Sequence, residues 1–269
     1  MNTPDQIRFD EPHCGLQRLD ARFGGHAYDL HRHETYAVGL TLRGMQVFHY
    51  RGTQRASRAG QVMVLHPDEA HDGHAGSTSG FEYRMLYVDP GSITAALGGA
   101  PPPFVPDAVA DDPALAAVLH EAFCDFPRAL EPLAVDAIVE RLAEGLGARG
   151  DAGKRPARHP TAHRAASRAR DFLMADATHA IASRELEDVS GLDRFSLARH
   201  FRATFGTSPH RFQVGRRLAR ARTMIAQGVP LSETAAATGF ADQSHLTRHF
   251  AARFGLTPGR WAALSRGGA

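Results

Sequence analysis

The C-terminal third of this 269-residue chain contains an internal repeat, and this feature restricts the possible fold more than any other. Residues 193–211 and 242–260 align at an offset of 49 residues, with ten identical positions out of 19. Unrelated segments would share about one or two positions, so the repeat is one supersecondary unit that occurs twice. We therefore expect two similar units in tandem.

Each copy predicts a short helix, a glycine turn and a longer helix. The expected short helices are Glu185–Ser190 and Glu233–Thr238, with N-caps at Ser183 and Ser232, turns at Gly191 and Gly239, and C-terminal glycines at Gly206 and Gly255. This layout is typical of the helix-turn-helix, whose second helix enters the major groove of DNA. A connecting helix, expected at His210–Gln227, would space the two units so that they contact successive major grooves.

The faces opposite the apolar stripes of the two longer helices carry the candidate DNA contacts. Arginine pairs with guanine and glutamine pairs with adenine in the major groove, while arginines at the edge of such a face contact phosphates. We expect the phosphate role for Arg202 and Arg253. The full predicted set is Arg194, Phe195, Ser196, Arg199 and Arg202 in the first copy, and Gln243, Ser244, His245, Arg248 and Arg253 in the second.

Charge is distributed unevenly along the chain and favours the same interpretation. Residues 1–153 hold 12 arginines and no lysine against 21 acidic residues, a net charge of −9, whereas residues 154–269 carry +11. A solvated basic surface without a partner would also give this imbalance. Because two helix-turn-helix copies lie inside the basic half, double-stranded DNA is the expected partner.

The repeat and its motifs resemble those of the AraC/XylS family of transcription regulators. The segment GFADQSHLTRHFAARFGLTPGRW (Gly239–Trp261) looks like the signature of that family, while Phe195 occupies a position where the family usually has a small or polar residue. The resemblance implies a small-molecule effector and possible contact with RNA polymerase. The apolar faces of the two helices expected near residues 115–123 and 135–146 indicate a homodimer.

The N-terminal half has the pattern of an antiparallel β-domain followed by helices. Strands are expected at Tyr36–Leu42, Met45–Tyr50, Gln61–Leu65 and Glu82–Val88, punctuated by Gly44, Gly52 and Gly60, and helices near residues 115–123 and 135–146. The predicted fold is multidomain α+β, with an N-terminal cupin-like β-barrel, accessory helices and a C-terminal all-α domain. The expected divisions are residues 1–108 for the effector-binding domain, 109–147 for a helical dimerisation segment, 148–160 for a linker and 161–269 for the DNA-binding domain.

A cluster of histidines in this half indicates a binding site. His31 and His33 share one face of a strand and, with His71, are similar to the metal-binding histidines of a cupin. Glu34 follows His33 directly, whereas metal-binding cupins place the glutamate several residues later. We therefore expect no metal or other cofactor. The interpretation favours effector contact over structural histidines, with candidates His31, His33, Tyr50, His71, Tyr83 and Met85.

Other classes of protein fit less well. The chain has no apolar run long enough to span a membrane, and Cys14 and Cys124 form neither a zinc motif nor a disulfide framework. We also expect no secretory signal. We expect a cytoplasmic regulator without catalytic residues or membrane contact. Two alternatives stay open, namely a metal-dependent cupin enzyme with a basic DNA-binding tail and an architectural DNA binder without an effector.

Overall fold

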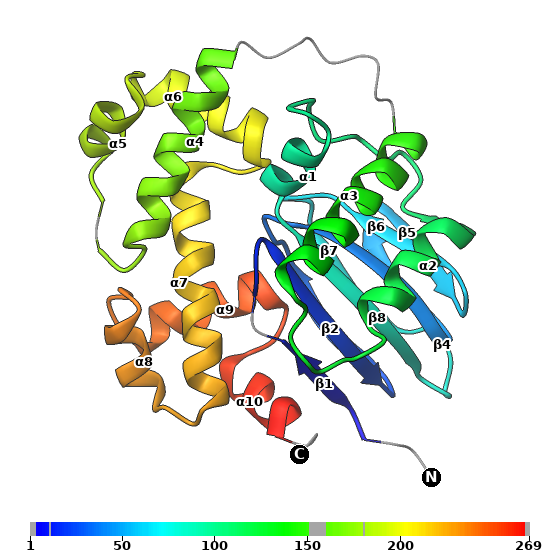
Figure 1. The fold of residues 1–269 in the computed structure, drawn as a ribbon. Coiled ribbons are helices and arrows are strands. Elements are labelled where there is room, and N and C mark those ends of the chain that lie inside the picture. Colours follow the sequence, from blue (N-terminus) through cyan, green and yellow to red (C-terminus); the bar gives the residue numbers. More distant parts are fainter. Residues whose placement is uncertain (1–3, 11, 151–159, 180, 267–269) are drawn as a thin grey trace.

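The computed structural model describes residues 4–10, 12–150, 160–179 and 181–266. A sheet-rich N-terminal domain lies beside a helical C-terminal domain (Figure 1), as the sequence predicts. No helix within these residues is both long enough and apolar enough to cross a bilayer. The expected linker is only partly described, because residues 151–159 lie outside these ranges.

The strands form two antiparallel sheets that share the longest strand. One sheet has the order β1-β2-β8-β4-β6-β9, and the far half of β4 pairs with β5 and β7 in the second sheet, where β7 also pairs with β3. The strands are β1 (Gln6–Phe9), β2 (Leu16–Phe23), β3 (His26–His31), β4 (Tyr36–Tyr50), β5 (Thr53–Arg58), β6 (Val62–Leu65), β7 (His71–Ala75), β8 (Phe81–Val88) and β9 (Val109–Ala110).

Strand β4 corrects one expectation, because the predicted strands Tyr36–Leu42 and Met45–Tyr50 are a single strand. Gly44 has a φ of 68° and bends β4 instead of ending it. A Cβ atom at Gly44 would lie 2.0 Å from the carbonyl oxygen of Gly80, so this close approach requires glycine. The bend lets one strand take part in both sheets.

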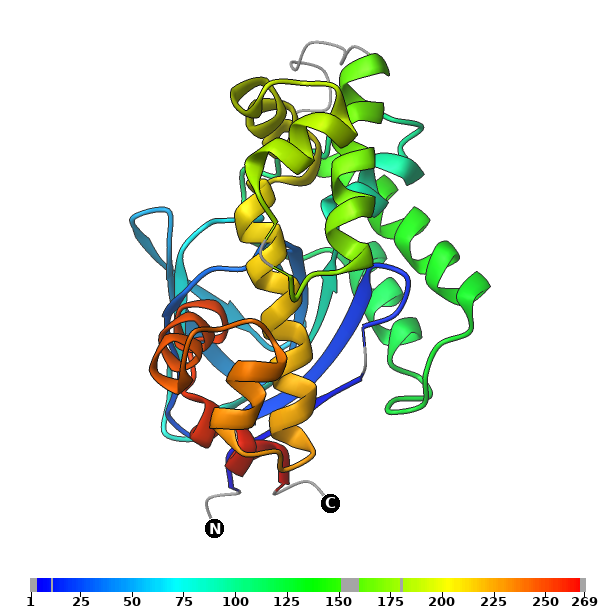
Figure 2. The ribbon, with the colours of Figure 1, turned by 90° about the vertical axis from the view of Figure 1, so that its left-hand side faces the viewer.

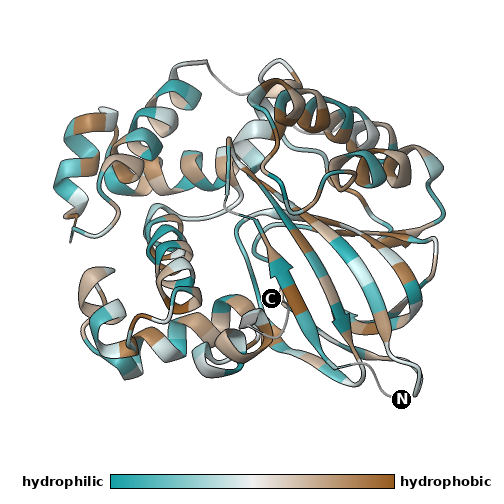
Figure 3. Cartoon of the chain, turned by 60° about the horizontal axis from the view of Figure 1, so that its bottom comes forward, coloured by the Kyte–Doolittle hydropathy of each residue, from teal (hydrophilic) through white to brown (hydrophobic). Residues whose placement is uncertain are grey.

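Three labelled helices cover one face of the first sheet (Figures 1 and 3), and they are α1 (Pro90–Ala96), α2 (Pro113–Ala122) and α3 (Pro132–Arg149). The apolar faces of α2 and α3 pack within the same chain, where Leu119 and Leu142 are fully buried against sheet residues such as Val38 and Leu86. The apolar residues that suggested a dimer contact are therefore already used inside the domain.

The helical domain contains the two predicted copies. Its helices are α4 (Pro160–Ala175), α5 (Ser183–Ser190), α6 (Arg194–Phe205), α7 (Pro209–Ala226), α8 (Leu231–Ala237), α9 (Gln243–Phe254) and α10 (Pro258–Arg266). Figure 2 shows α7 as the central helix between the α4–α6 group and the α8–α10 group. Ser183 is the first residue of α5, not its N-cap, and Ser232 lies inside α8, whose cap is Pro230. Glu185 instead accepts the backbone N–H of Ala182, at 2.7 Å, and so satisfies the start of α5.

The two copies are attached to the sheet domain in different ways. Residues of the second copy, including Leu246, Phe250 and Trp261, join one continuous apolar cluster with sheet residues such as Tyr83 and Phe23. The first copy has a separate cluster, whose members are Ala166, Ala169, Leu173, Leu197, Phe201, Phe205 and Phe212. The second copy therefore shares its core with the sheet domain, whereas the first packs around a core of its own.

Candidate nucleic-acid interface and interdomain cavity

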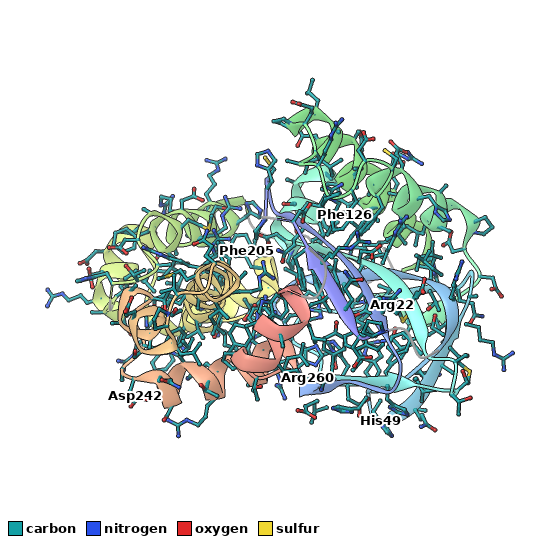
Figure 4. All side chains as sticks on the ribbon, turned by 90° about the horizontal axis from the view of Figure 1, so that it is seen from below. Arg22, His49, Phe126, Phe205, Asp242 and Arg260 are labelled. Carbon is teal, nitrogen blue, oxygen red and sulfur yellow. The ribbon has the colours of Figure 1, made fainter. Side chains whose placement is uncertain are left out.

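The second helices of the two copies, α6 and α9, are named here the recognition helices. Asp193 caps α6 by accepting the backbone N–H groups of Phe195 and Ser196, each at 3.0 Å, and Asp242 caps α9 by accepting that of His245 at 2.7 Å. Figure 4 shows Asp242 at the outer edge of the helical domain, away from the sheets. The caps fix the first turn of each helix, the part that contacts base edges in helix-turn-helix proteins.

Most of the predicted DNA contacts are exposed on these helices. The exposed residues are Arg194, Phe195, Arg199, Arg202, Gln243, Ser244 and Arg248. Ser196 and His245 are half-buried. The ring of His245 lies 4.6 Å from that of His249, and Nδ1 of His245 accepts the backbone N–H of Ala241 at 3.3 Å. Ser196 and His245 still lie in the first turns of α6 and α9, beside the exposed residues that are expected to contact DNA.

Arg253 does not lie on this surface, and this corrects the expected phosphate role. Its guanidinium group forms an ion pair with Glu34 of the sheet domain at 2.7 Å, and both side chains are largely buried. Burial lowers the pKa of Arg253 and raises the pKa of Glu34, because each charged form loses solvation. Glu34 also lies against Gly215, so one side chain of the sheet domain contacts both α7 and α9.

The C-terminal ends of both recognition helices abut the sheet domain. Equivalent glycines, Gly206 and Gly255, end the helices in the left-handed conformation. A Cβ atom at Gly206 would lie 2.8 Å from Pro67, and one at Gly255 would lie 2.7 Å from the carbonyl oxygen of Asp29. The N–H of Asp29 also donates to the carbonyl of Gly255 at 2.9 Å. The sheet domain therefore contacts both recognition helices at corresponding positions.

An interdomain cavity of about 620 Å³ lies between the two domains. Aromatic rings from both sides dominate its wall, and cationic groups come from the helical domain. Its lining includes Phe9, Tyr28, His31, His33, Glu34 and Tyr87 from the sheet domain, and Arg170, Arg216, Ala219, Arg222, Arg253 and Trp261 from the helical domain. Figure 4 shows Phe205, another wall residue, between the two domains.

Three residues of this wall each carry one buried polar atom that has no hydrogen-bond partner among the described residues. These atoms are Nε2 of His33, Nε of Arg253 and Nε1 of Trp261. His33 Nδ1 lies 2.9 Å from the carbonyl oxygen of Thr35, so in the neutral ring that nitrogen carries the proton and Nε2 is an acceptor. Arg253 and Trp261 offer N–H donors. Buried polar groups without partners are costly, so the cavity is suited to a ligand that has polar groups of its own.

The histidine cluster itself is compact. The ring of His71 lies 4.2 Å from that of His31 and 4.8 Å from that of His33. Each Nδ1 contacts a backbone carbonyl oxygen two residues away in sequence. Burial lowers the pKa of His31 and lowers that of His71 to about 4, so both rings are neutral at pH 7. Within the described ranges, no three His, Cys, Asp or Glu side chains are placed to hold a metal ion.

Only two of the six predicted effector contacts, His31 and His33, line the interdomain cavity. His71 packs against both of them, while the hydroxyl of Tyr83 donates to that of Tyr28 at 2.7 Å inside the apolar core. Tyr50 bonds to His66 at 3.0 Å, and Met85 packs against Gly39. All four side chains are buried within the sheet domain and lie outside the residues that line the cavity.

Segments far apart in the chain contribute cavity residues that the sequence did not predict. Arg222 donates to Gln17 at 2.8 Å, and the ring of Trp261 lies 4.5 Å from that of Phe9. Arg222 also lies over the ring of Phe9, at 4.8 Å. The only signal in the sequence is the aromatic and basic character of these residues, which does not distinguish a cavity wall from an ordinary core.

Comparisons with known proteins agree with this architecture. Residues 13–143 match the model of the AraC-like ligand binding domain, and residues 186–263 match that of a helix-turn-helix domain. The chain is 23% identical over 241 residues to an uncharacterized HTH-type transcriptional regulator, YbfI, of Bacillus subtilis (strain 168), covering 87% of each protein.

Solved structures of ToxT from Vibrio cholerae have a similar fold. One covers 93% of this chain and 99% of its own, at 10% identity and a TM-score of 0.66. Another, from strain O395, covers 95% and 100%, at 10% identity and a TM-score of 0.68. With an AraC-like ligand binding domain and a helix-turn-helix domain both matched, this chain has the domain composition of a ligand-sensing, DNA-binding transcription regulator of the AraC type.

Proposed function

We propose that this regulator binds DNA through the exposed first turns of α6 and α9 and senses an effector in the interdomain cavity. The expected DNA contacts are those on the exposed faces, with Arg199 and Arg248 at equivalent positions of the repeat. Both can pair with guanine. Because α7 connects the two units, they would occupy successive major grooves on one face of the duplex.

The observation that carries the effector proposal is that three residues lining one cavity each carry a buried polar atom without a partner. A carboxylate would accept the N–H groups of Arg253 and Trp261, and a hydroxyl or a protonated acid would donate to His33. The aromatic wall would hold an apolar body. We therefore propose an amphipathic carboxylic acid as the effector.

Ligands of the structural relative support this class. ToxT has been solved with an unsaturated fatty acid and with (E)-4-(8-methylnaphthalen-1-yl)but-3-enoic acid. Each of these molecules joins an apolar body to a carboxylic acid. The cavity of about 620 Å³ in this chain is of the size that holds such ligands.

The cavity is placed so that its occupant can influence DNA binding. Its wall contains Glu34 and Arg253, the ion pair that joins the sheet domain to α9. It also contains Phe205, the last residue of α6, which lies four residues before α7 begins at Pro209. A ligand that binds one arrangement of the two domains better than another shifts the population toward that arrangement. We propose this shift as the means by which the effector alters operator affinity.

DNase footprinting and fluorescence anisotropy with the full-length protein test the DNA part of the proposal. Fragments upstream of its own gene and of neighbouring genes are the first targets. We expect a protected region covering two successive major grooves on one face, with an affinity that falls as salt increases. Binding of equal strength to every fragment, with and without candidate acids, would show that the protein is an architectural DNA binder.

A matched pair of tryptophan substitutions tests the cavity. Ala219 lines the cavity, whereas Ala226 lies exposed near the end of the same helix, so Ala219→Trp fills the space and Ala226→Trp does not. A library of aliphatic and aromatic acids is screened by thermal shift. An acid at 100 times its Kd stabilises the protein by about 2.7 kcal/mol, and Ala219→Trp should abolish this shift while Ala226→Trp retains it. An equal response of both variants would place the effector elsewhere.

Trp261→Phe tests the hydrogen bond separately from the packing. The substitution keeps an aromatic ring and removes the indole N–H, which should weaken acid binding about fivefold, the equivalent of ~1 kcal/mol. Homodimer formation, which the two apolar helices suggested, and contact with RNA polymerase, which the resemblance implies, complete the proposal. Sedimentation equilibrium with and without operator DNA would measure the first, and in vitro transcription with purified polymerase would test the second.

A further inference from the structure

Phe195 is an aromatic residue on a solvent-facing surface, at the second position of α6. Its exposed fraction is 70%, whereas Phe201 and Phe205 of the same helix are almost fully buried. It belongs to none of the three apolar clusters formed by the described residues. The position equivalent to Phe195 in the repeat is Ser244. Neither helix packing nor the repeat explains a phenylalanine here.

The surroundings of Phe195 are polar and suited to DNA. The guanidinium group of Arg194 lies 4.9 Å from the centroid of its ring, and Arg199 donates to Ser196 at 3.1 Å one turn away. The hydrogen bonds that Asp193 accepts from Phe195 and Ser196 hold the start of the helix in place. The ring is therefore on the same exposed turn as the groups expected to contact bases and phosphates.

The edges of base pairs in the major groove offer one apolar group, the C5-methyl of thymine. Side chains at the start of a recognition helix are the ones that contact these edges. We propose that Phe195 contacts a thymine methyl group and so requires thymine at one position of the half-site bound by α6. The proposal rests on the proposed function of α6 as a DNA-contacting helix, and it names the base specificity of that site.

The repeat adds a second consequence. Because Ser244 replaces Phe195 in the second copy, the half-site bound by α9 lacks this requirement at the corresponding position. Arg194 and Gln243 are also equivalent and differ, while Arg199 and Arg248 are identical. The two half-sites should therefore share the base contacted by the common arginine and differ at the neighbouring thymine.

Replacement of thymine by uracil tests the proposal, because it removes the methyl group and preserves base pairing. The operator is first obtained with the full-length protein by selection from random duplexes, and each thymine of the α6 half-site is then replaced in turn. Loss of one buried methyl group should weaken binding about fourfold, since such a group contributes ~0.8 kcal/mol. We expect this loss at one thymine for the unmodified protein, measured by fluorescence anisotropy.

Phe195→Ala should bind the thymine operator about fourfold more weakly and no longer distinguish thymine from uracil at that position. Because Phe195 is exposed, the substitution should leave folding intact, as circular dichroism would check. Phe195→Leu retains an apolar contact and should keep part of the discrimination. Leu133→Ala removes an exposed apolar side chain from α3 of the sheet domain and serves as the matched control. Ser244→Phe should create sensitivity to uracil in the α9 half-site.

Two outcomes would overturn the inference while leaving the proposed function intact. In one, the protein binds its operator specifically but tolerates uracil at every thymine of the α6 half-site. In the other, Phe195→Ala matches the unmodified protein in affinity yet loses transcriptional response, which would assign the ring to a protein contact. Failure of the full-length protein to select any sequence would instead overturn both the inference and the proposed DNA binding.

Discussion

Gly255→Ala is the substitution that most directly tests contact between the sheet domain and the second recognition helix. Gly255 has a φ of 65°, where any residue with a Cβ atom costs about 1–2 kcal/mol. Its added Cβ would also meet the carbonyl oxygen of Asp29 and Nδ1 of His31, each at 2.7 Å. Forcing atoms into such a tightly packed place costs a further ~1–3 kcal/mol. We expect a total loss of about 2–5 kcal/mol.

Gly228→Ala is the matched control for this substitution. Gly228 has a φ of 84° just beyond α7, and no atom lies within 4 Å of the position of an added Cβ. It should therefore lose only the backbone contribution of about 1–2 kcal/mol. The difference between the two variants, measured by urea denaturation, isolates the interdomain contact from the conformational cost of alanine.

Hydrogen exchange then localises the effect. The backbone N–H of Asp29 donates to Gly255, and that of Arg32 donates to the carbonyl of Ala252 at 3.2 Å. In Gly255→Ala these two amides should exchange at least tenfold faster, because a loss of 1.4 kcal/mol in local stability changes the open fraction by that factor. Equal stability of Gly255→Ala and Gly228→Ala, together with unchanged exchange of both amides, would refute the contact between β3 and α9 in solution.

Three further predictions concern the stability of the sheet domain and DNA binding. Burial lowers the pKa of His71 to about 4, below the value near 6.5 of an unfolded chain. Between these pH values the unfolded state binds more protons than the folded state, so the free energy of unfolding decreases as the pH is lowered. From pH 7 to pH 5 this group alone should remove roughly 2 kcal/mol from the free energy of unfolding, and His71→Gln should reduce that dependence; an unchanged slope would argue against the buried, neutral ring. Arg18 is fully buried, pairs with Asp10 at 2.5 Å and donates to the carbonyl of Ala122 at 2.8 Å. Arg18→Met leaves Asp10 without its partner and should lower the free energy of unfolding by about 3 kcal/mol in a denaturant titration. An unchanged free energy of unfolding would show that the ion pair contributes nothing to stability. Arg248→Ala should relax one base preference by ~1–3 kcal/mol in competition binding, while an equal loss on all sequences would assign that side chain to a phosphate.

The sequence alone was sufficient for those features that depend on local periodicity. The offset of 49 residues predicts two helix-turn-helix copies, and α6 and α9 lie where it places them. Gly206 and Gly255 end both helices in the left-handed conformation, as their positions after the apolar stripes suggest. Such features follow from the spacing of apolar, capping and glycine residues along a single segment. This spacing can be read from the sequence without knowledge of the tertiary structure.

The pairing of strands was harder to predict, because the sequence of one strand does not identify the strand with which it pairs. The bend of β4 at Gly44 depends on the approach of Gly80, a residue in another part of the chain. Sequence reasoning treats each such glycine as a turn, since a turn is the common reason for a glycine between two apolar runs.

Tertiary structure alone decided what the two domains do to each other. Arg253 follows the apolar stripe of α9 and has the spacing of a phosphate contact, yet Glu34 of the sheet domain holds it in a buried ion pair. The cavity likewise joins residues as distant as Gln17 and Arg222. Periodicity tells which face of a helix is apolar or charged, but the partner of that face is determined by domain docking, which involves segments far apart in the chain. The two recognition helices are therefore evident in the sequence, and the cavity between the domains is evident only in the folded molecule.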